Sequence, residues 1–291
     1  MPRQKPETYV IWKGTRFMAV HTPLRPTPVR RRRTRRRRRR FSPGLLIAAA
    51  VLLGIAAAAL VLLVSAISSR SKGYDKGQAP WCIGLDAGHG GSDPGAVGLI
   101  SEADMTEATV QALQALLEAD DRFTVVLCRE MGETVERPSQ RAIRGNELGA
   151  DLLLSIHGNS DATGEGYGFE CYPVTPGNEL ADPSRELAEC LAAAFESAGA
   201  RLRGDAGIRY AYYEGENSDS KVIREGNDMT VYEAPTFGFL EYAQAPAVLA
   251  EQCFVTNSED VALLGSGEGV QRAAQCYYEA ICAFFEVEPL A

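Results

Sequence analysis

The feature that most constrains this chain is the stretch of residues 41–69, which contains no charged side chain. Its central part, residues 44–67, consists almost entirely of Ala, Leu, Ile and Val. A helix over these residues would be roughly 36 Å long, which exceeds the hydrocarbon core of a bilayer at about 30 Å. Because such a helix is apolar on every side, lipid suits it better than water does. We therefore expect residues 41–69 to form one transmembrane anchor.

A cleaved signal peptide is the alternative interpretation of this stretch, because Val64-Ser65-Ala66 resembles a small-residue cleavage site. The apolar core of a signal peptide usually spans about 7 to 15 residues, which is much shorter than the stretch found here. The length therefore favours an uncleaved anchor.

The charge of the chain divides at the same place. Residues 1–40 carry fifteen Lys or Arg and one acid, Glu7, for a net charge of +14, whereas the remainder carries 15 basic and 37 acidic residues, for a net charge of −22. The arginine runs 30–33 and 35–40 adjoin the anchor, so the positive-inside rule predicts a cytoplasmic tail attracted to anionic lipid headgroups. Binding of nucleic acid or a localisation signal is the alternative for such a run. We expect no nucleic-acid partner.

Seven cysteines follow the apolar stretch, and their odd number and spacing match no metal motif. Most lie within apolar runs, which is typical of small buried hydrophobic side chains. The sequence therefore predicts no particular disulfide. The seven are Cys82, Cys128, Cys171, Cys190, Cys253, Cys276 and Cys282.

A short polar linker, residues 70–80, follows the anchor. After it, short apolar runs alternate with longer helical patterns. The expected strands are 81–86, 123–128, 151–157, 167–172 and 247–254, and the expected helices are 102–119, 139–149, 183–198 and 269–285. This alternation predicts one α/β domain over residues 81–291, with a largely parallel sheet covered on both faces. Residues 204–235 do not fit the pattern and indicate a long loop or a small insertion.

Two histidines and one glutamate end three of the expected strands. His21 lies in the basic tail, so His89 and His157 are the histidines of the domain, and Glu251 lies late in a third strand. In open α/β sheets the carboxyl ends of the strands form the ligand-binding edge. The carboxylate of Glu251 follows an apolar run, Ala-Val-Leu-Ala, so it needs a partner or a metal to offset its desolvation. These three residues therefore indicate a metal or proton-handling site at one edge.

Glu102 begins the expected helix after the glycine-rich loop 88–96. Glycines around His89 allow positive φ angles, which a tight metal-binding loop can use. Two roles for Glu102 stay open on these grounds. It could be a metal ligand, or it could complement the helix dipole, as Asp104 and Glu107 could do equally well.

Four separated motifs combine these residues: Leu-Asp-Ala-Gly-His-Gly-Gly-Ser-Asp-Pro-Gly-Ala around His89, then Glu102, Ser-Ile-His-Gly-Asn-Ser around His157, and Pro-Ala-Val-Leu-Ala-Glu ending at Glu251. Together they resemble the zinc-dependent N-acetylmuramoyl-L-alanine amidases of the amidase-3 family. The match in order and spacing extends over nearly all of residues 81–287. Supporting matches are Arg141, Asn146, Asn257 and Glu259.

The resemblance implies a three-layer α/β fold with a mostly parallel six-stranded sheet flanked by helices. It implies Zn²⁺ on His89, Glu102 and His157, with Glu251 as the catalytic acid/base. It also implies a peptidoglycan hydrolase that cuts the amide bond between N-acetylmuramic acid and L-alanine of the stem peptide. Together with the anchor, it predicts a single-pass protein of the bacterial cell membrane. The N-terminus would be cytoplasmic and the zinc amidase domain would lie on the outer face, so peptidoglycan and the cytoplasmic membrane are the expected partners.

Two departures from the family pattern stand out. Cys253 follows Glu251 by two residues, so on a regular strand it faces the same side, where a thiol could compete for zinc or simply fill space. The second departure is the insert at residues 209–235, which could shape the substrate groove. We favour a solvated surface loop.

Two other functions remain compatible with the same motifs. The domain could be a catalytically silent module that binds peptidoglycan or scaffolds an envelope complex, or a zinc amidase or peptidase that cuts another bond of the stem peptide. Whether an activator protein acts on the helix that begins at Glu102 stays open.

Overall fold

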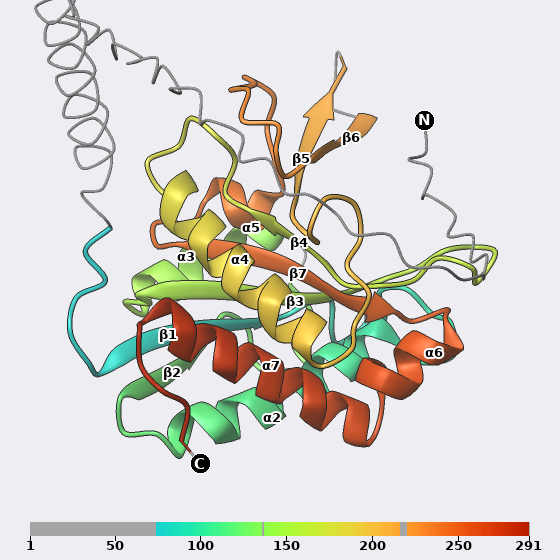
Figure 1. Cartoon of the computed structure of the whole chain (residues 1–291), viewed down its shortest axis with the longest axis horizontal. Helices are drawn as coiled ribbons and strands as arrows, with labels where there is room; N and C mark the ends of the chain where they lie inside the picture. The colour runs from blue at the N-terminus through green and yellow to red at the C-terminus, as the bar shows by residue number, and fades with distance from the viewer. Residues whose placement is uncertain (1–73, 136, 216–219, 291) are drawn as a thin grey trace, which may run out of the picture. The chain divides into compact units, whose positions relative to one another are not determined.

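The computed structural model of this chain describes residues 74–135, 137–215 and 220–290 (Figure 1). The predicted basic tail, residues 1–40, and the predicted anchor, residues 41–69, lie outside them. Among the described residues, no helix combines the length and the apolar character needed to cross a membrane. The described part covers the end of the predicted linker and nearly all of the predicted domain.

Five strands form one sheet in the order β2-β1-β3-β7-β4. They are β1 (Trp81–Ala87), β2 (Phe123–Leu127), β3 (Leu152–Asn159), β4 (Glu170–Pro173) and β7 (Ala247–Phe254). The first four of that order run parallel, and β4 pairs antiparallel with β7 at the edge. The helices are α2 (Glu102–Glu118), α3 (Pro138–Glu147), α4 (Ala181–Ser197), α5 (Gly238–Glu241), α6 (Ser258–Asp260) and α7 (Glu268–Phe284), with the π-helical turn η1 (Val261–Gly265) before α7.

Helices cover both faces of this sheet. Successive side chains of a strand point to opposite faces, so Leu152 and Leu154 enter one hydrophobic core while Leu153 enters the other. The first core is completed by α2, α4 and α7, and the second by α3 and α5 (Figure 1). The expectation of a mostly parallel α/β sheet flanked by helices is therefore confirmed. Each of the nine predicted strands and helices is present, with ends within three residues of the prediction.

The expected six-stranded sheet is wrong, because the sheet has five strands. Beyond β4, the pairing of the described chain at this edge is limited to two isolated bridges, Phe169 with Leu202 and Cys171 with Ile208. Between them lies a tight turn with positive φ at Gly204, Ala206 and Gly207, which interrupts regular pairing. The chain then leaves the edge of the sheet.

Residues 204–235, predicted as a long loop or a small insertion, are built around a hairpin, which replaces the solvated surface loop favoured for residues 209–235. β5 (Arg209–Glu214) and β6 (Ser220–Glu225) pair antiparallel as a separate two-stranded sheet. Tyr210 and Tyr212 are buried on one face of β5, where apolar packing compensates for the polar composition of the insert. The hairpin stands beside β4 and α5 (Figure 1).

The cysteines behave mainly as small core residues. All seven are free, five are buried, and Cys82 and Cys190 are partly exposed. The interpretation of most of them as buried hydrophobic side chains is confirmed.

Candidate metal centre

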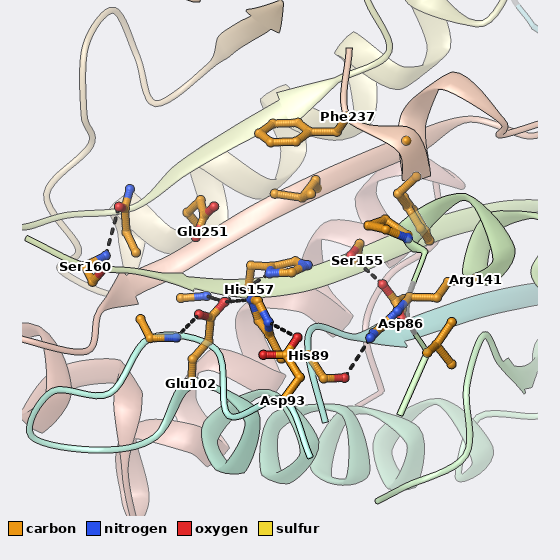
Figure 2. A pocket seen from close by; sticks show the side chains of 18 of the residues that line it. Asp86, His89, Asp93, Glu102, Arg141, Ser155, His157, Ser160, Phe237 and Glu251 are labelled. Atoms are coloured by element: carbon orange, nitrogen blue, oxygen red, sulfur yellow. Dashed lines mark hydrogen bonds and ion pairs between the residues drawn. The ribbon is translucent and has the colours of Figure 1, made fainter. Parts of the chain in front are cut away.

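The carboxyl edge of the sheet brings the two domain histidines together. His89 follows the end of β1, and His157 lies near the end of β3, the strand next to β1. Glu102 is the first residue of α2, whose first turn packs under the same edge. Ser101 occupies the N-cap position of α2, although its side chain makes no capping hydrogen bond. Residues far apart in the sequence therefore converge at one point (Figure 2).

The three side chains form a compact set of potential ligands, with one ligand atom from each lying within 4.8 Å of the others. Glu102 Oε1 is 3.2 Å from His89 Nε2 and 3.0 Å from His157 Nδ1. Zinc binds N and O ligands at about 2.0–2.1 Å in tetrahedral geometry, which separates ligand atoms by roughly 3.3 Å. The donor types and their spacing therefore fit a zinc ion with one open coordination position.

The charges of these groups are strongly coupled. Burial alone would raise the pKa of Glu102, but hydrogen bonds from His157 and His89 outweigh it and hold that pKa far below its usual range. The hydrogen bond to Glu102 raises the pKa of His89 to about 9, against the opposing effect of burial. Metal ligation requires a neutral imidazole, so a cation would have to displace this proton. In the metal-free cluster the Glu102 carboxylate is thus paired with a protonated His89, and a bound cation would take the place of that proton.

The loop that carries His89 is held in an unusual conformation. His89 has a φ of 60°, and the φ angles of its neighbours Gly90 and Gly91 are also positive, at 112° and 61°. Asp93 Oδ2 lies 2.8 Å from His89 Nδ1, which orients the ring so that Nε2 faces Glu102. The backbone N–H of Ala96 donates to Glu102 Oε2 at 2.9 Å, so the other end of the loop is fastened to the cluster too.

Close packing behind His157 requires a glycine. A Cβ on Gly88 would come within 2.5 Å of the His157 ring. The backbone N–H of Gly158 donates to Glu102 Oε1, the same oxygen that faces both histidines. Backbone groups therefore help to position the carboxylate.

A buried ion pair between Arg141 and Asp86 supports the loop that carries His89. Arg141 on α3 donates to Asp86 Oδ1 at 3.0 Å and to the backbone carbonyl oxygens of Ala87 and His89. Ser155 donates to the other oxygen of Asp86 at 2.6 Å. Because Arg141 and Asp86 are both buried, breaking the pair would leave an uncompensated charge. The pair fixes the path of the backbone at His89.

Glu251 lies beside the cluster. It is the register partner of His157 on the neighbouring strand β7, so both side chains point to the same face of the sheet. Its Oε2 atom is buried and makes no hydrogen bond with the described residues, although the residue as a whole is partly exposed. Burial raises the pKa of Glu251 to about 7, while His157 opposes the rise and Glu102 adds to it. A carboxyl with this pKa can take and return a proton near neutral pH.

A second carboxylate, Glu170, lies one strand further along the same row. It pairs in register with Glu251 across β4 and β7 and is almost fully buried. Its charge is balanced, because Arg203 and Arg209 each donate to its Oε2 at 2.9 Å and Asn159 donates to its Oε1. Of the two adjacent glutamates, only Glu251 is therefore left free for chemistry.

A cavity of about 390 Å³ opens over these residues. Its floor holds the histidines, Glu102 and Glu251, and one wall is apolar and aromatic. That wall consists of Val135, Pro138, Tyr213, Phe237, Phe239 and Leu249. Figure 2 shows the ring of Phe237 on the far side of Glu251 and His157 from His89.

Cys253 does not reach the ligand cluster, so the prediction that it faces the same side as Glu251 is wrong. The pairing of β3 with β7 slips by one residue between His157 and Asn159, and this bulge turns Cys253 to the opposite face. There the Cys253 thiol contacts the sulfur of Met105 at 3.5 Å in the core under α2.

The supporting residues have mainly structural contacts. Asn146 bonds to the backbone of Tyr242 and Gln244, and Asn257 caps α6. Glu259 pairs with Arg201 at the surface. Sequence reasoning missed Asp93, Glu170 and Phe237. For Asp93 a signal existed, since it follows His89 by four residues in the glycine-rich loop, whereas the contacts of Glu170 and Phe237 depend on strand order and on the hairpin.

Comparisons with known proteins agree with one another. A family profile described as N-acetylmuramoyl-L-alanine amidase (Amidase_3) matches residues 83–283. The chain is 28% identical over 232 residues to a probable N-acetylmuramoyl-L-alanine amidase, AmiB, of Haemophilus influenzae, covering 71% of this chain and 52% of that protein. It is 25% identical over 223 residues to the amidase AmiC of Escherichia coli, covering 71% and 53%. The chain thus spans about half the length of these curated relatives.

A solved structure shares the fold. The catalytic domain of CwlV, an N-acetylmuramoyl-L-alanine amidase from Bacillus (Paenibacillus) polymyxa, superposes with a TM-score of 0.56 at 26% identity. The superposition covers 72% of this chain and 99% of that domain. The likeness therefore extends over a whole catalytic domain.

Proposed function

The chain belongs to the Amidase_3 family of N-acetylmuramoyl-L-alanine amidases, and from this premise we propose that it is a zinc-dependent peptidoglycan hydrolase. The bond cut would be the amide between the lactyl group of N-acetylmuramic acid and L-alanine of the stem peptide. One observation supports this most: the ligand set of His89, Glu102 and His157 lies beside a carboxyl, Glu251, whose Oε2 has no hydrogen-bond partner in the described chain.

His89, Glu102 and His157 would hold the zinc ion. Zinc bound in such an open site supplies a Lewis acid that polarises a carbonyl and lowers the pKa of water. Asp93 and the backbone N–H groups of Ala96 and Gly158 would keep the ligand side chains in position. Such supporting contacts fix ring orientation and ligand basicity.

Glu251 would act as general base and then as general acid. In its carboxylate form it accepts a proton from the attacking water, whose oxygen bonds to the lactyl carbonyl carbon. As the C–N bond breaks, Glu251 returns that proton to the leaving nitrogen. The products are a lactyl carboxylic acid on the sugar and a free amine on L-alanine, so atoms and protons balance. The apolar side chains that line the cavity beside Glu251 would favour its protonated form during this exchange.

Mass spectrometry of digested cell wall tests the bond assignment. Purified peptidoglycan treated with the zinc-loaded chain should release stem peptides with a free amino-terminal L-alanine, leaving glycan strands with intact N-acetylmuramic acid. Fragments cleaved within the stem peptide or between sugars would instead indicate another specificity. If the chain releases no product, a catalytically silent binding module is favoured.

We also propose that residues 41–69 anchor the domain on the outer face of the bacterial cell membrane, with the tail in the cytoplasm. The described chain enters β1 at the amino end of the parallel strands, whereas the cavity lies at their carboxyl end. Lys76 fastens this entry segment to the domain by donating to Glu186 and to the backbone of Phe284. The described segment that follows the proposed anchor is therefore held at the edge of the sheet opposite the cavity.

A further inference from the structure

The hairpin of β5 and β6 places a cation beside the aromatic wall of the cavity. Tyr213 and Lys221 are direct cross-strand partners, so their side chains project from the same face of the hairpin. Tyr213 lines the cavity, and the ammonium of Lys221 lies 5.0 Å from the centre of the Phe237 ring. This face of the hairpin is therefore turned toward the candidate active site.

The position of this face is held by contacts on several sides. Arg209, on the same face of β5, donates to Glu170, the register neighbour of Glu251. The Tyr213 backbone N–H donates to the carbonyl of Pro235, which joins the hairpin to the segment leading to Phe237. The Phe237 ring also packs edge-on against Tyr172 and Tyr213, with centroids 5.2 and 6.0 Å apart. The aromatic wall is thus pre-organised, and little ordering would be needed on binding.

Lys221 differs from the other cations of the hairpin. Arg209 is shared between Glu170 and Glu225, and Arg224 pairs with Glu214. Among the described residues, no carboxylate lies within ion-pair distance of the Lys221 ammonium, and the residue is exposed. The one arginine that lines the cavity, Arg141, is bonded to Asp86. Of the cations in the described part of the hairpin, Lys221 is therefore the one with no described carboxylate partner, which leaves its ammonium available to an anionic group.

The order of groups across the site determines which part of a substrate meets the hairpin. From β1 to β4 the sheet presents His89, His157, Glu251 and Glu170, and the hairpin lies beyond. If Glu251 returns a proton to the leaving amine, the peptide side of the scissile bond lies beside Glu251, between the ligand cluster and the hairpin. The stem peptide continues from L-alanine to an acidic residue whose carboxyl is free or amidated.

We propose that Lys221, with Phe237 and Tyr213, forms a subsite for the stem peptide that recognises a free carboxylate on its second residue. The aliphatic part of the peptide would pack on the Phe237 ring, and the carboxylate would meet the Lys221 ammonium. This subsite rests on the proposed amidase function and deepens it, because it makes the insert at residues 209–235 a determinant of substrate choice. An ion pair at an exposed position changes affinity by up to about fivefold.

Matched N-acetylmuramoyl tripeptides, with either a carboxylate or a carboxamide on the second residue, test this subsite. The wild-type chain should cleave the carboxylate form with a kcat/KM about three- to fivefold higher. Lys221→Gln should reduce this ratio to about one, whereas Lys221→Arg should restore it. Arg224→Gln removes a charge from the other face of the same strand and should leave the ratio as in wild type.

The outcomes separate two failures. A wild-type chain that cleaves both tripeptides equally, or a Lys221→Gln chain that keeps the preference, overturns the subsite but not the amidase. A zinc-loaded wild-type chain that cleaves neither tripeptide, nor purified peptidoglycan, overturns the amidase function and the subsite with it.

Discussion

Glu251→Gln should abolish amide hydrolysis while zinc stays bound. Glutamine keeps the shape of the side chain but cannot accept or return a proton, and general acid–base catalysis contributes about 10²- to 10⁴-fold to rates. We therefore expect kcat to fall about a thousandfold. Because Glu251 is the neighbour of His157 and no member of the ligand cluster, the zinc content should not change. Stem-peptide release and metal analysis on the same sample measure both quantities.

The fold should tolerate this substitution. Burial raises the pKa of Glu251 from 4.5 to about 7, so the folded state holds this proton more tightly than the unfolded state does. Stability therefore falls as the pH rises from about 4.5 to about 7, and the full cost of ionising the buried carboxyl persists above that range. A neutral glutamine avoids this cost, and the variant should be at least as stable as wild type at pH 8 without metal. The same substitution at exposed Glu165 is the matched control and should retain activity. Full turnover by Glu251→Gln, or loss of its zinc, would contradict the role assigned to Glu251.

Glu102→Gln should remove both zinc and activity. The Glu102 carboxylate is buried between two histidines, and its Oε1 faces a nitrogen of each. The neutral amide of glutamine removes the one anionic member of the ligand set, so the positive charge of zinc is no longer balanced there. Altering even the groups that support a ligand costs about 10- to 100-fold in metal affinity, so losing a ligand should cost a hundredfold or more. Competition with a chromogenic zinc chelator measures the change.

Asp104→Asn is the matched control for Glu102→Gln. Asp104 lies in the same first turn of α2 and is exposed. If first-turn acids served only the helix dipole, the two substitutions would have similar small effects of under about 1 kcal/mol on stability and none on zinc. Zinc retained by Glu102→Gln would therefore assign Glu102 to the dipole and remove it from the metal centre.

Much of the fold could be predicted because its strands and helices have strong local signals. The run Leu152-Leu153-Leu154 is apolar on both sides, and the sheet buries both of its faces there. The hairpin escaped prediction since the stretch around it is rich in Gly, Asp, Glu and Asn and its two strands pair with each other and not with the main sheet. The number of strands was inferred from resemblance, and the turn around Gly204 to Gly207 breaks the sixth.

The candidate site was predictable to the extent that it depends on strand ends. His89, His157 and Glu251 follow from the rule that parallel strands deliver their carboxyl ends to one edge. The place of Glu102 depended on resemblance, because sequence alone could not separate it from Asp104. The face of Cys253 was mispredicted, since a bulge of one residue reverses every side chain after it and leaves no clear sign in the sequence.

Titration of the metal-free chain with zinc tests the central claim most directly. The metal would be removed with a chelator, and hydrolysis of purified peptidoglycan followed as zinc is added. With one site made by His89, Glu102 and His157, activity should rise linearly and level off at one zinc ion per chain. Full activity in the chelator before any zinc is added, or no activity at any zinc concentration, would contradict a zinc centre at these residues as the seat of the chemistry.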